Sequence, residues 1–253
     1  MSDHEPSVKE QRAAARKRFA VATRLEKEYM RSLRQLSKQI DQIVKGMVPT
    51  GTADNSHQIA ALLRSYSDTI RPWAQSIARR MLERVADKDE KAWIELSRDI
   101  GKSLRKELND APIGLPLQRL LDEQVHLITS LPLDAAQRVH KMTTEGLLQG
   151  RRASDIAKDI LETGRVTESR AKLIARTEVA RTAASLTQAR SQHVGVTHYI
   201  WRTSKDPDVR ESHKEMDGKV IPWDTAPTLS DGTKTHAGMI YNCRCYPEPV
   251  ITD

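Results

Sequence analysis

The chain has 253 residues, 38% of them hydrophobic and only 4% aromatic, a composition that allows one or two domains with modest cores and favours helix over sheet. Two cysteines are too few for a disulfide framework, and no apolar run approaches the roughly 20 residues of a membrane span. We therefore expect neither a disulfide-stapled secreted protein nor any contact with a membrane.

The net charge of +7 is concentrated in one stretch. Residues 9–45 hold 11 Lys and Arg against 4 Asp and Glu, which accounts for the whole excess. Such a stretch is either a solvated helix face or a surface for nonspecific contact with nucleic acid, where cationic side chains displace condensed counterions. The residues that would make this contact are Arg12, Arg16, Lys17, Arg18, Arg24 and Lys27.

Three apolar series predict long helices in the first part of the chain. Residues Tyr29, Leu33, Leu36, Ile40, Ile43 and Met47 form a heptad seam. A similar series runs from Ile59 to Met81, and Pro72 inside it predicts a kink or a break near Arg71. A third helix is expected to carry Trp93, Leu96, Ile100, Leu104 and Leu108. We assign these helices to a basic region, residues 1–110, whose seams pack either within one chain or between copies of it.

The middle of the chain, residues 111–195, is predicted to contain shorter helices. The sequence DAPIGLPLQ, residues 110–118, has two prolines and a glycine and predicts a hinge. Capping oxygens and terminal glycines then predict helices that begin at Asp134, Ser154 and Thr167. These helices are expected to end at Gly150, Gly164 and Gly195.

The last part, residues 196–253, differs in composition and predicts a small α+β lobe. It holds two of the four Trp, three of the five Tyr and five of the eleven Pro residues. The alternating sequence THYIWRT predicts a strand, and EMDGKVIPW predicts a hairpin around Asp217-Gly218. The expected fold is therefore mainly α, with long N-terminal helices, shorter helices, and a compact C-terminal lobe with a few short strands.

Both cysteines lie in this lobe, in the sequence YNCRCYP. A disulfide between Cys243 and Cys245 is improbable, because only one residue separates them and so short a spacing suits the geometry of a disulfide poorly. A local turn can instead aim two thiolates at one metal ion, with His213 and His236 as further ligands. The alternative is ordinary packing of these side chains. In either case we interpret the Cys-x-Cys pair as a structural clasp.

Three separated motifs resemble the phage head-morphogenesis family of minor head proteins, the group named for protein F of phage Mu. They are IARTEVART on a helix, then WRTSKDPDVRESHKEMDGKVIPW, then HAGMIYNCRCYPEP, and the resemblance covers residues from about 130 to 250. It implies a structural role in head assembly rather than an enzymatic one.

Some members of that family have a Cys-x-x-Cys pair ahead of the Asp-Gly turn, which looks like half of a zinc knuckle. In this sequence Arg210 and His213 replace that pair, and an arginine cannot bind a metal because it has no free acceptor. A structural zinc ion would therefore have at most His213, His236, Cys243 and Cys245 as ligands. Structural roles are expected for Arg210, Asp217, Gly218, Asn242 and Arg244.

The resemblance implies a minor capsid protein of a tailed phage that acts near the portal. Its partners would be the portal protein, the major capsid or scaffolding protein, further copies of itself, and packaged DNA bound without sequence preference. It would be found in the host cytoplasm during assembly and inside the procapsid or virion head. The alternative is a metal-dependent hydrolase, a nuclease or peptidase, built around His213 and His236 with Glu211 or Glu215 as base.

Overall fold

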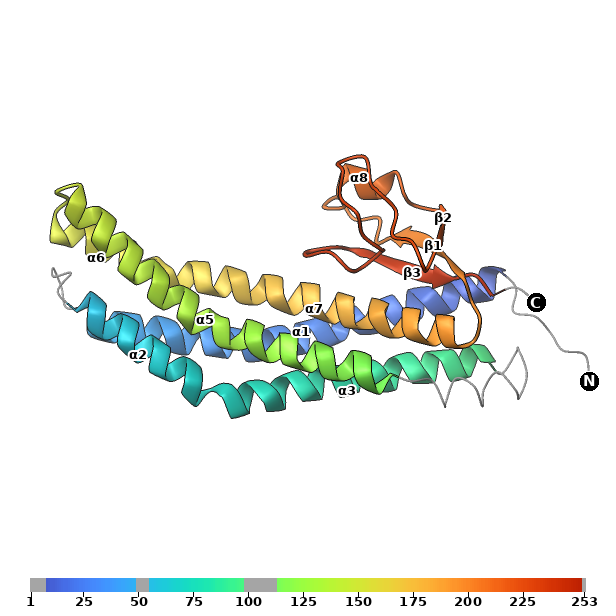
Figure 1. Cartoon of the computed structure of the whole chain (residues 1–253), viewed down its shortest axis with the longest axis horizontal. Helices are drawn as coiled ribbons and strands as arrows, with labels where there is room; N and C mark the ends of the chain where they lie inside the picture. The colour runs from blue at the N-terminus through green and yellow to red at the C-terminus, as the bar shows by residue number, and fades with distance from the viewer. Residues whose placement is uncertain (1–7, 49–54, 98–112, 252–253) are drawn as a thin grey trace, which may run out of the picture. The chain divides into compact units, whose positions relative to one another are not determined.

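A computed structural model describes residues 8–48, 55–97 and 113–251 of the chain (Figure 1). Its helices are α1 (Val8–Met47), α2 (Ser56–Thr69), α3 (Arg71–Ser97), α5 (Gly114–Leu148), α6 (Ala153–Leu161), α7 (Thr163–His193) and the short α8 (Glu211–Lys214). The strands are β1 (His198–Thr203), β2 (Val220–Pro222) and β3 (Cys245–Pro249). The predicted fold class, mainly α with a small C-terminal α+β unit, is confirmed.

The chain forms two compact units that interleave along the sequence. One unit contains residues 1–27, 80–120 and 176–253, and the other contains residues 28–79 and 121–175. The three-part division by sequence position stays a prediction. No helix among the described residues combines the length and the apolar character that crossing a membrane would require.

The unit of residues 28–79 and 121–175 is entirely helical in its described part. The predicted seam is buried at Tyr29, Leu33, Leu36 and Ile40, but its next buried residue is Val44 rather than Ile43. A straight α-helix drifts against a strict seven-residue repeat, which explains this shift by one position. Tyr29 donates to Gln124 Oε1 over 2.7 Å, so the seam packs against α5 of the same chain.

The predicted break near Arg71 is confirmed, since α2 ends at Thr69 and α3 begins at Arg71. The predicted start of the third helix is wrong. Trp93 is buried near the end of α3 and does not belong to a new helix. The remaining residues of that prediction, from Ile100 to Leu108, lie outside the described part of the chain.

The predicted start at Asp134 is wrong, because α5 runs without interruption from Gly114 to Leu148. Residues 114–118 of the predicted hinge belong to this helix, and residues 110–112 lie outside the described part of the chain. Pro132 lies inside this helix, although a proline there removes a backbone hydrogen bond at a cost of about 3 kcal/mol. The buried stripe on both sides of it offsets that cost. The stripe contains Val125, Ile128, Leu131, Ala135 and Val139.

Gly164 does not end a helix, and Thr167 does not begin one. The helix α7 starts at Thr163 and includes both residues, while α6 starts at Ala153 and ends at Leu161. Gly164 faces Asp41 of α1 so closely that a Cβ atom would overlap that side chain. The glycine therefore serves a close helix–helix approach, which a sequence pattern does not distinguish from a helix stop.

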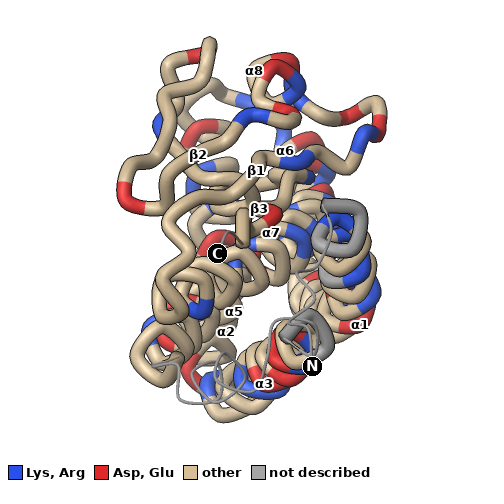
Figure 2. Tube along the Cα trace, turned by 90° about the vertical axis from the view of Figure 1, so that its right-hand side faces the viewer, with Lys and Arg blue, Asp and Glu red and all other residues tan. Residues whose placement is uncertain are grey.

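In the other unit, a buried ion pair joins α3 to α7. Arg190 Nε lies 2.9 Å from Asp89 Oδ2, and their side chains are 2% and 5% exposed. Thr187 donates to the same carboxylate, on Oδ1, over 3.2 Å. Figure 2 colours the charged residues along these helices and along α1.

The lobe contains one antiparallel sheet in the order β2-β1-β3. The predicted strand THYIWRT is confirmed as β1, whose inward residues Tyr199, Trp201 and Thr203 are buried. The predicted hairpin is wrong, because β2 pairs with β1 and not with the residues before Asp217. The helix α8 occupies the long connection between these two strands, so the Asp217-Gly218 turn follows a helix.

Two prolines protect the outer edge of β3. Pro247 and Pro249 stand opposite Trp201 and Tyr199 of β1. Along an antiparallel strand, backbone N–H groups point alternately toward the partner strand and away from it. Val250 N–H points toward β1, since it donates to His198 O. The nitrogens of Pro249 and Pro247, one and three residues earlier, therefore point away from β1 to the open edge. That edge consequently lacks two of the donors that another strand would need.

We expect Gly238→Ala to destabilise the lobe. Gly238 has φ +82°, and a Cβ atom there would lie 3.1 Å from Ala184 Cβ and 3.2 Å from the Cys245 carbonyl oxygen. The left-handed backbone and the tight contact together predict a loss of about 1–3 kcal/mol in unfolding free energy. Urea denaturation measures it, and Gly232→Ala, at φ +80° in open space, separates the backbone effect from the contact. Equal losses in the two variants would contradict the role of the contact.

Candidate metal centre

Three donor side chains converge where α8, the 239–244 loop and β3 meet. His213 lies on α8, Cys243 lies in the loop, and Cys245 is the first residue of β3. Asn242 has φ +53°, so the chain turns sharply just before Cys243. The turn ends with Cys245 N–H donating to Cys243 Sγ over 3.4 Å, which places both sulfur atoms on one side of the loop.

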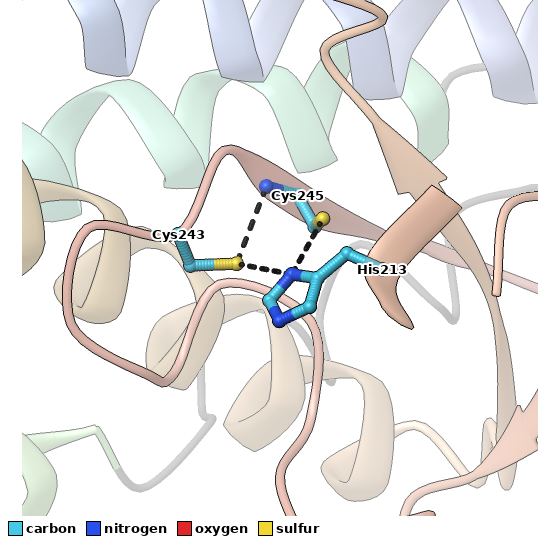
Figure 3. Close-up of side chains that lie close together, drawn as sticks. All are labelled: His213, Cys243 and Cys245. Carbon is cyan, nitrogen blue, oxygen red and sulfur yellow. Dashed lines mark hydrogen bonds between the residues drawn. The ribbon is translucent and has the colours of Figure 1, made fainter. Parts of the chain in front are cut away.

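The imidazole of His213 lies between the two sulfur atoms (Figure 3). Its Nδ1 atom is 3.3 Å from Cys245 Sγ and 3.5 Å from Cys243 Sγ. All three donor atoms lie within 4.8 Å of one another, and the three residues are 2–3% exposed. Both cysteines are free.

The pKa values of the two thiol groups are shifted in opposite directions. The hydrogen bond between them lowers the pKa of Cys243 and raises the pKa of Cys245, and burial opposes the first shift and adds to the second. A bound metal would displace the thiol protons, because thiolates and not thiols are metal ligands.

The surroundings of the cluster fit a soft metal ion. The indole nitrogen of Trp201 is buried beside Cys245 and favours the ionised form of that thiol. The Trp201 ring also meets the His213 ring edge to face, with centroids 5.5 Å apart, and so fixes its orientation. Two thiolates and one imidazole are a donor set that suits zinc.

Comparison with known proteins shows that this region is similar to one family. Residues 137–247, from the middle of α5 into β3, match the family described as Phage Mu protein F like protein. The matched region includes α8, the loop and β3, so all three members of the cluster lie in it.

Two curated relatives extend the comparison. An uncharacterized protein of Haemophilus influenzae is 30% identical over 96% of this chain and 58% of its own length. The NAD(+)–arginine ADP-ribosyltransferase EFV of Enterococcus faecalis is 30% identical over 47% of this chain and 26% of its own length. The chain thus spans little more than half of the first relative and a quarter of the second. No solved structure matches the chain.

Within the region that the family matches, His236 lies apart from the cluster. Its Nδ1 atom is 3.1 Å from the Tyr199 hydroxyl, and its ring centroid is 5.9 Å from that of Trp223. Burial lowers the pKa of His236 and Asp224 opposes this shift. Of the four proposed ligands, the structure brings together His213, Cys243 and Cys245 and leaves His236 in an aromatic contact.

Charged residues fix the loops around the centre. Arg244 pairs with Asp206 at 2.8 Å and with Asp208 at 3.1 Å. Arg210 donates to the Tyr241 carbonyl over 3.1 Å and lies above the Tyr241 ring. Both arginines thus connect the 204–210 segment to the loop that carries Cys243.

The remaining residues with predicted structural roles fix turns of the matched region. Asp217 accepts hydrogen bonds from the backbone and the hydroxyl of Thr203, and Gly218 has φ +88°. Asn242 N–H donates to Thr177 on α7 over 2.9 Å, which attaches the cysteine loop to the long helix. This last contact explains why the IARTEVART motif and the cysteine motif occur in one matched region.

The structure places the six residues predicted to contact nucleic acid in different surroundings. Lys17, Arg24 and Lys27 line a cavity of about 750 Å³ in the unit that contains the lobe. Arg16 interacts with Tyr246, Arg12 is half-buried, and the Arg18 side chain lies outside what the structure describes.

Sequence reasoning missed two buried ion pairs of this unit. One is Arg190 with Asp89, and the other is Arg202 with Glu248, where the guanidinium contacts both carboxylate oxygens at 2.6 and 3.1 Å. The partners are 101 and 46 residues apart, so no local pattern points to them. Only the prediction of a strand at residues 198–203 could have suggested the pair of Arg202 with Glu248.

Proposed function

We propose that this chain is a structural protein of phage head morphogenesis. The observation that carries the proposal is the family match over residues 137–247, which includes the cysteine loop and the part of α7 that holds it. The Haemophilus influenzae relative supports the same assignment for nearly the whole chain without naming a function.

In this proposal the protein acts during procapsid assembly, near the portal, and contacts the portal protein together with the major capsid or scaffolding protein. It is then present in the host cytoplasm during assembly and inside the procapsid or the virion head. The long helices supply extended surfaces for such contacts, and α1 and α5 alone contain 40 and 35 residues. Association of several copies through these surfaces is part of the proposal.

The metal centre has a structural role in this proposal. All three donors are nearly inaccessible, which suits a closed site that holds the lobe together better than a site that must admit a substrate and water. Glu211, one of the bases considered for a hydrolase, is exposed and pairs with Lys214. The ADP-ribosyltransferase activity in the Enterococcus faecalis name is not extended to this chain, because only a quarter of that protein is matched.

The proposal predicts that the purified chain cosediments with procapsids of its phage when the portal protein is present. Procapsids assembled with and without portal protein would be incubated with the chain and separated on a sucrose gradient. We expect the chain in the procapsid fraction of the portal-containing sample and at the top of the other gradient.

Two results would contradict parts of this proposal. Absence from both procapsid fractions would reject the role in head assembly, and equal amounts in both would reject the location near the portal.

Variant His236→Ala, which leaves the Cys243–Cys245–His213 cluster intact, serves as the folded control for His213→Ala in the same gradients. Comparison of these variants shows whether the procapsid contact requires an intact lobe.

A further inference from the structure

The unit that contains the lobe has a cavity of about 750 Å³ that the metal centre does not account for. Three helices and the lobe line it: the first half of α1, the end of α3, the middle of α7, and the segment from Cys243 to Pro247. The cysteines form one end of the lining, so most of the cavity lies between helices.

Exposed cations from α1 and α3 form two rims of this cavity. They are Lys17, Arg24 and Lys27 on α1, and Arg84, Lys88 and Lys91 on α3. The three on α3 are four and three residues apart, which places them on one face of the helix. Arg24 and Lys27 have no ion pair with any residue that the structure describes.

The carboxylates in the lining are already engaged by arginines of the same unit. Glu26 pairs with Arg176 at 3.4 Å, Asp89 with Arg190 at 2.9 Å, and Asp206 with Arg244 at 2.8 Å. They therefore do little to offset the positive charge of the two rims. A ligand in the cavity would meet an excess of cationic groups.

The less exposed part of the lining, which we call the floor, is apolar and combines many small side chains with the larger Phe19 and Leu25. It contains Ala22, Val85, Val179, Ala180, Ala183 and Ala184. Small residues leave room for another backbone to approach, and an apolar floor gains free energy when water is displaced from it. The cavity therefore combines a hydrophobic base with cationic sides.

We propose that this cavity is the docking groove for an acidic amphipathic helix of a partner protein. The apolar stripe of such a helix would cover the alanine-rich floor, while Asp and Glu on both sides of the stripe would meet the rims on α1 and α3. The groove would bind such a segment whether or not the chain acts in head assembly.

Nucleic acid is the other polyanion that the cationic rims could attract. Its backbone has no continuous apolar stripe, and nonspecific binding depends on cations that reach phosphates rather than on a hydrophobic floor. The floor between the rims thus favours the peptide, and it provides a way to tell the two ligands apart.

The test uses the full chain and a fluorescein-labelled peptide of about 16 residues, long enough for several helical turns, with Leu and Ala on one face and Glu on both flanks. A scrambled peptide of equal composition and a single-stranded DNA of equal charge are the comparison probes. The variants are Arg24→Glu/Lys88→Glu in the rims and Ala183→Leu in the floor. Lys219→Glu/Lys234→Glu, on exposed lobe residues outside the cavity, is the matched charge control.

We expect fluorescence anisotropy to show that the amphipathic peptide binds about tenfold more tightly than the scrambled one. The rim variant should weaken peptide binding by about tenfold, because exposed ion pairs of about 0.2–1 kcal/mol are replaced by repulsion. The floor variant should weaken it as well, and the lobe control by less than about twofold.

Equal binding of the two peptides, or peptide binding that the rim and floor variants leave unchanged, would overturn the proposal. DNA that binds more tightly than the peptide, with an affinity that depends on the rims but not on Ala183, would also overturn it in favour of nucleic acid. Circular dichroism melting verifies that each variant is folded. Should the rim variant fail to fold, the floor variant alone decides.

Discussion

Replacement of Cys243 or Cys245 by serine is expected to abolish zinc binding by the protein and to lower its melting temperature. Each change removes one of the three converging donors. Loss of a residue that only supports a metal ligand lowers the metal affinity by roughly 10–100-fold. Loss of a ligand itself should lower the zinc affinity by more than this. At a zinc concentration 100 times the dissociation constant, the native chain gains about 2.7 kcal/mol of stability that the variants lack. Elemental analysis and calorimetry of proteins purified with zinc measure both effects.

The two histidines of the lobe provide the matched controls for this prediction. His213→Ala should behave like the serine variants, whereas His236→Ala should retain the metal, because its ring contacts Tyr199 and not the cluster. Native protein without bound zinc, together with melting temperatures that the cysteine variants leave unchanged, would reject the metal centre and leave a clasp made by packing alone. Zinc lost only in His236→Ala would place the site elsewhere.

Removal of the Arg190 guanidinium is expected to be the most destabilising change in the helical part of this unit. In Arg190→Leu the Asp89 carboxylate would remain buried beside the Thr187 hydroxyl without its guanidinium partner. Breaking a buried ion pair at one partner costs about 3–5 kcal/mol of unfolding free energy. Urea denaturation of the single variant and of Asp89→Leu/Arg190→Leu measures it, and the double variant should recover part of the loss.

An exposed ion pair on α3, the helix that carries Asp89, is the control for this effect. Lys91 and Asp87 lie 2.9 Å apart on α3, with side chains 62% and 51% exposed, and Lys91→Ala should cost less than about 1 kcal/mol. A cost for Arg190→Leu as small as that for Lys91→Ala would mean that the buried pair contributes little. Both carboxylates of this comparison, the buried Asp89 and the exposed Asp87, lie on α3.

The elements that sequence alone predicted well are those whose signal is repeated along the chain. The seam from Tyr29 to Ile40 and the alternation in residues 198–203 each place several side chains on one face, and tertiary packing agrees with both. The Cys-x-Cys pair and His213 were predicted to approach one another because few residue types can hold a metal ion. The structure places them together.

Single-residue signals were less reliable, because each has two physical meanings. Asp134 was interpreted as the cap of a new helix, yet α5 runs through it without interruption. Gly164 was interpreted as a helix stop, whereas the structure uses it for a close approach to Asp41. The choice between His213 and His236 as a metal neighbour depends on where α8 and the aromatic core lie, which no local pattern contains.

The prolines on the outer edge of β3 have a consequence wherever copies of the chain are crowded together. Identical chains at high local density risk pairing their sheets edge to edge, which leads to aggregation. Pro247 and Pro249 withhold two backbone donors from the β3 edge, so a strand of a neighbouring copy would pair poorly there. This edge of the lobe therefore resists polymerisation through backbone hydrogen bonds.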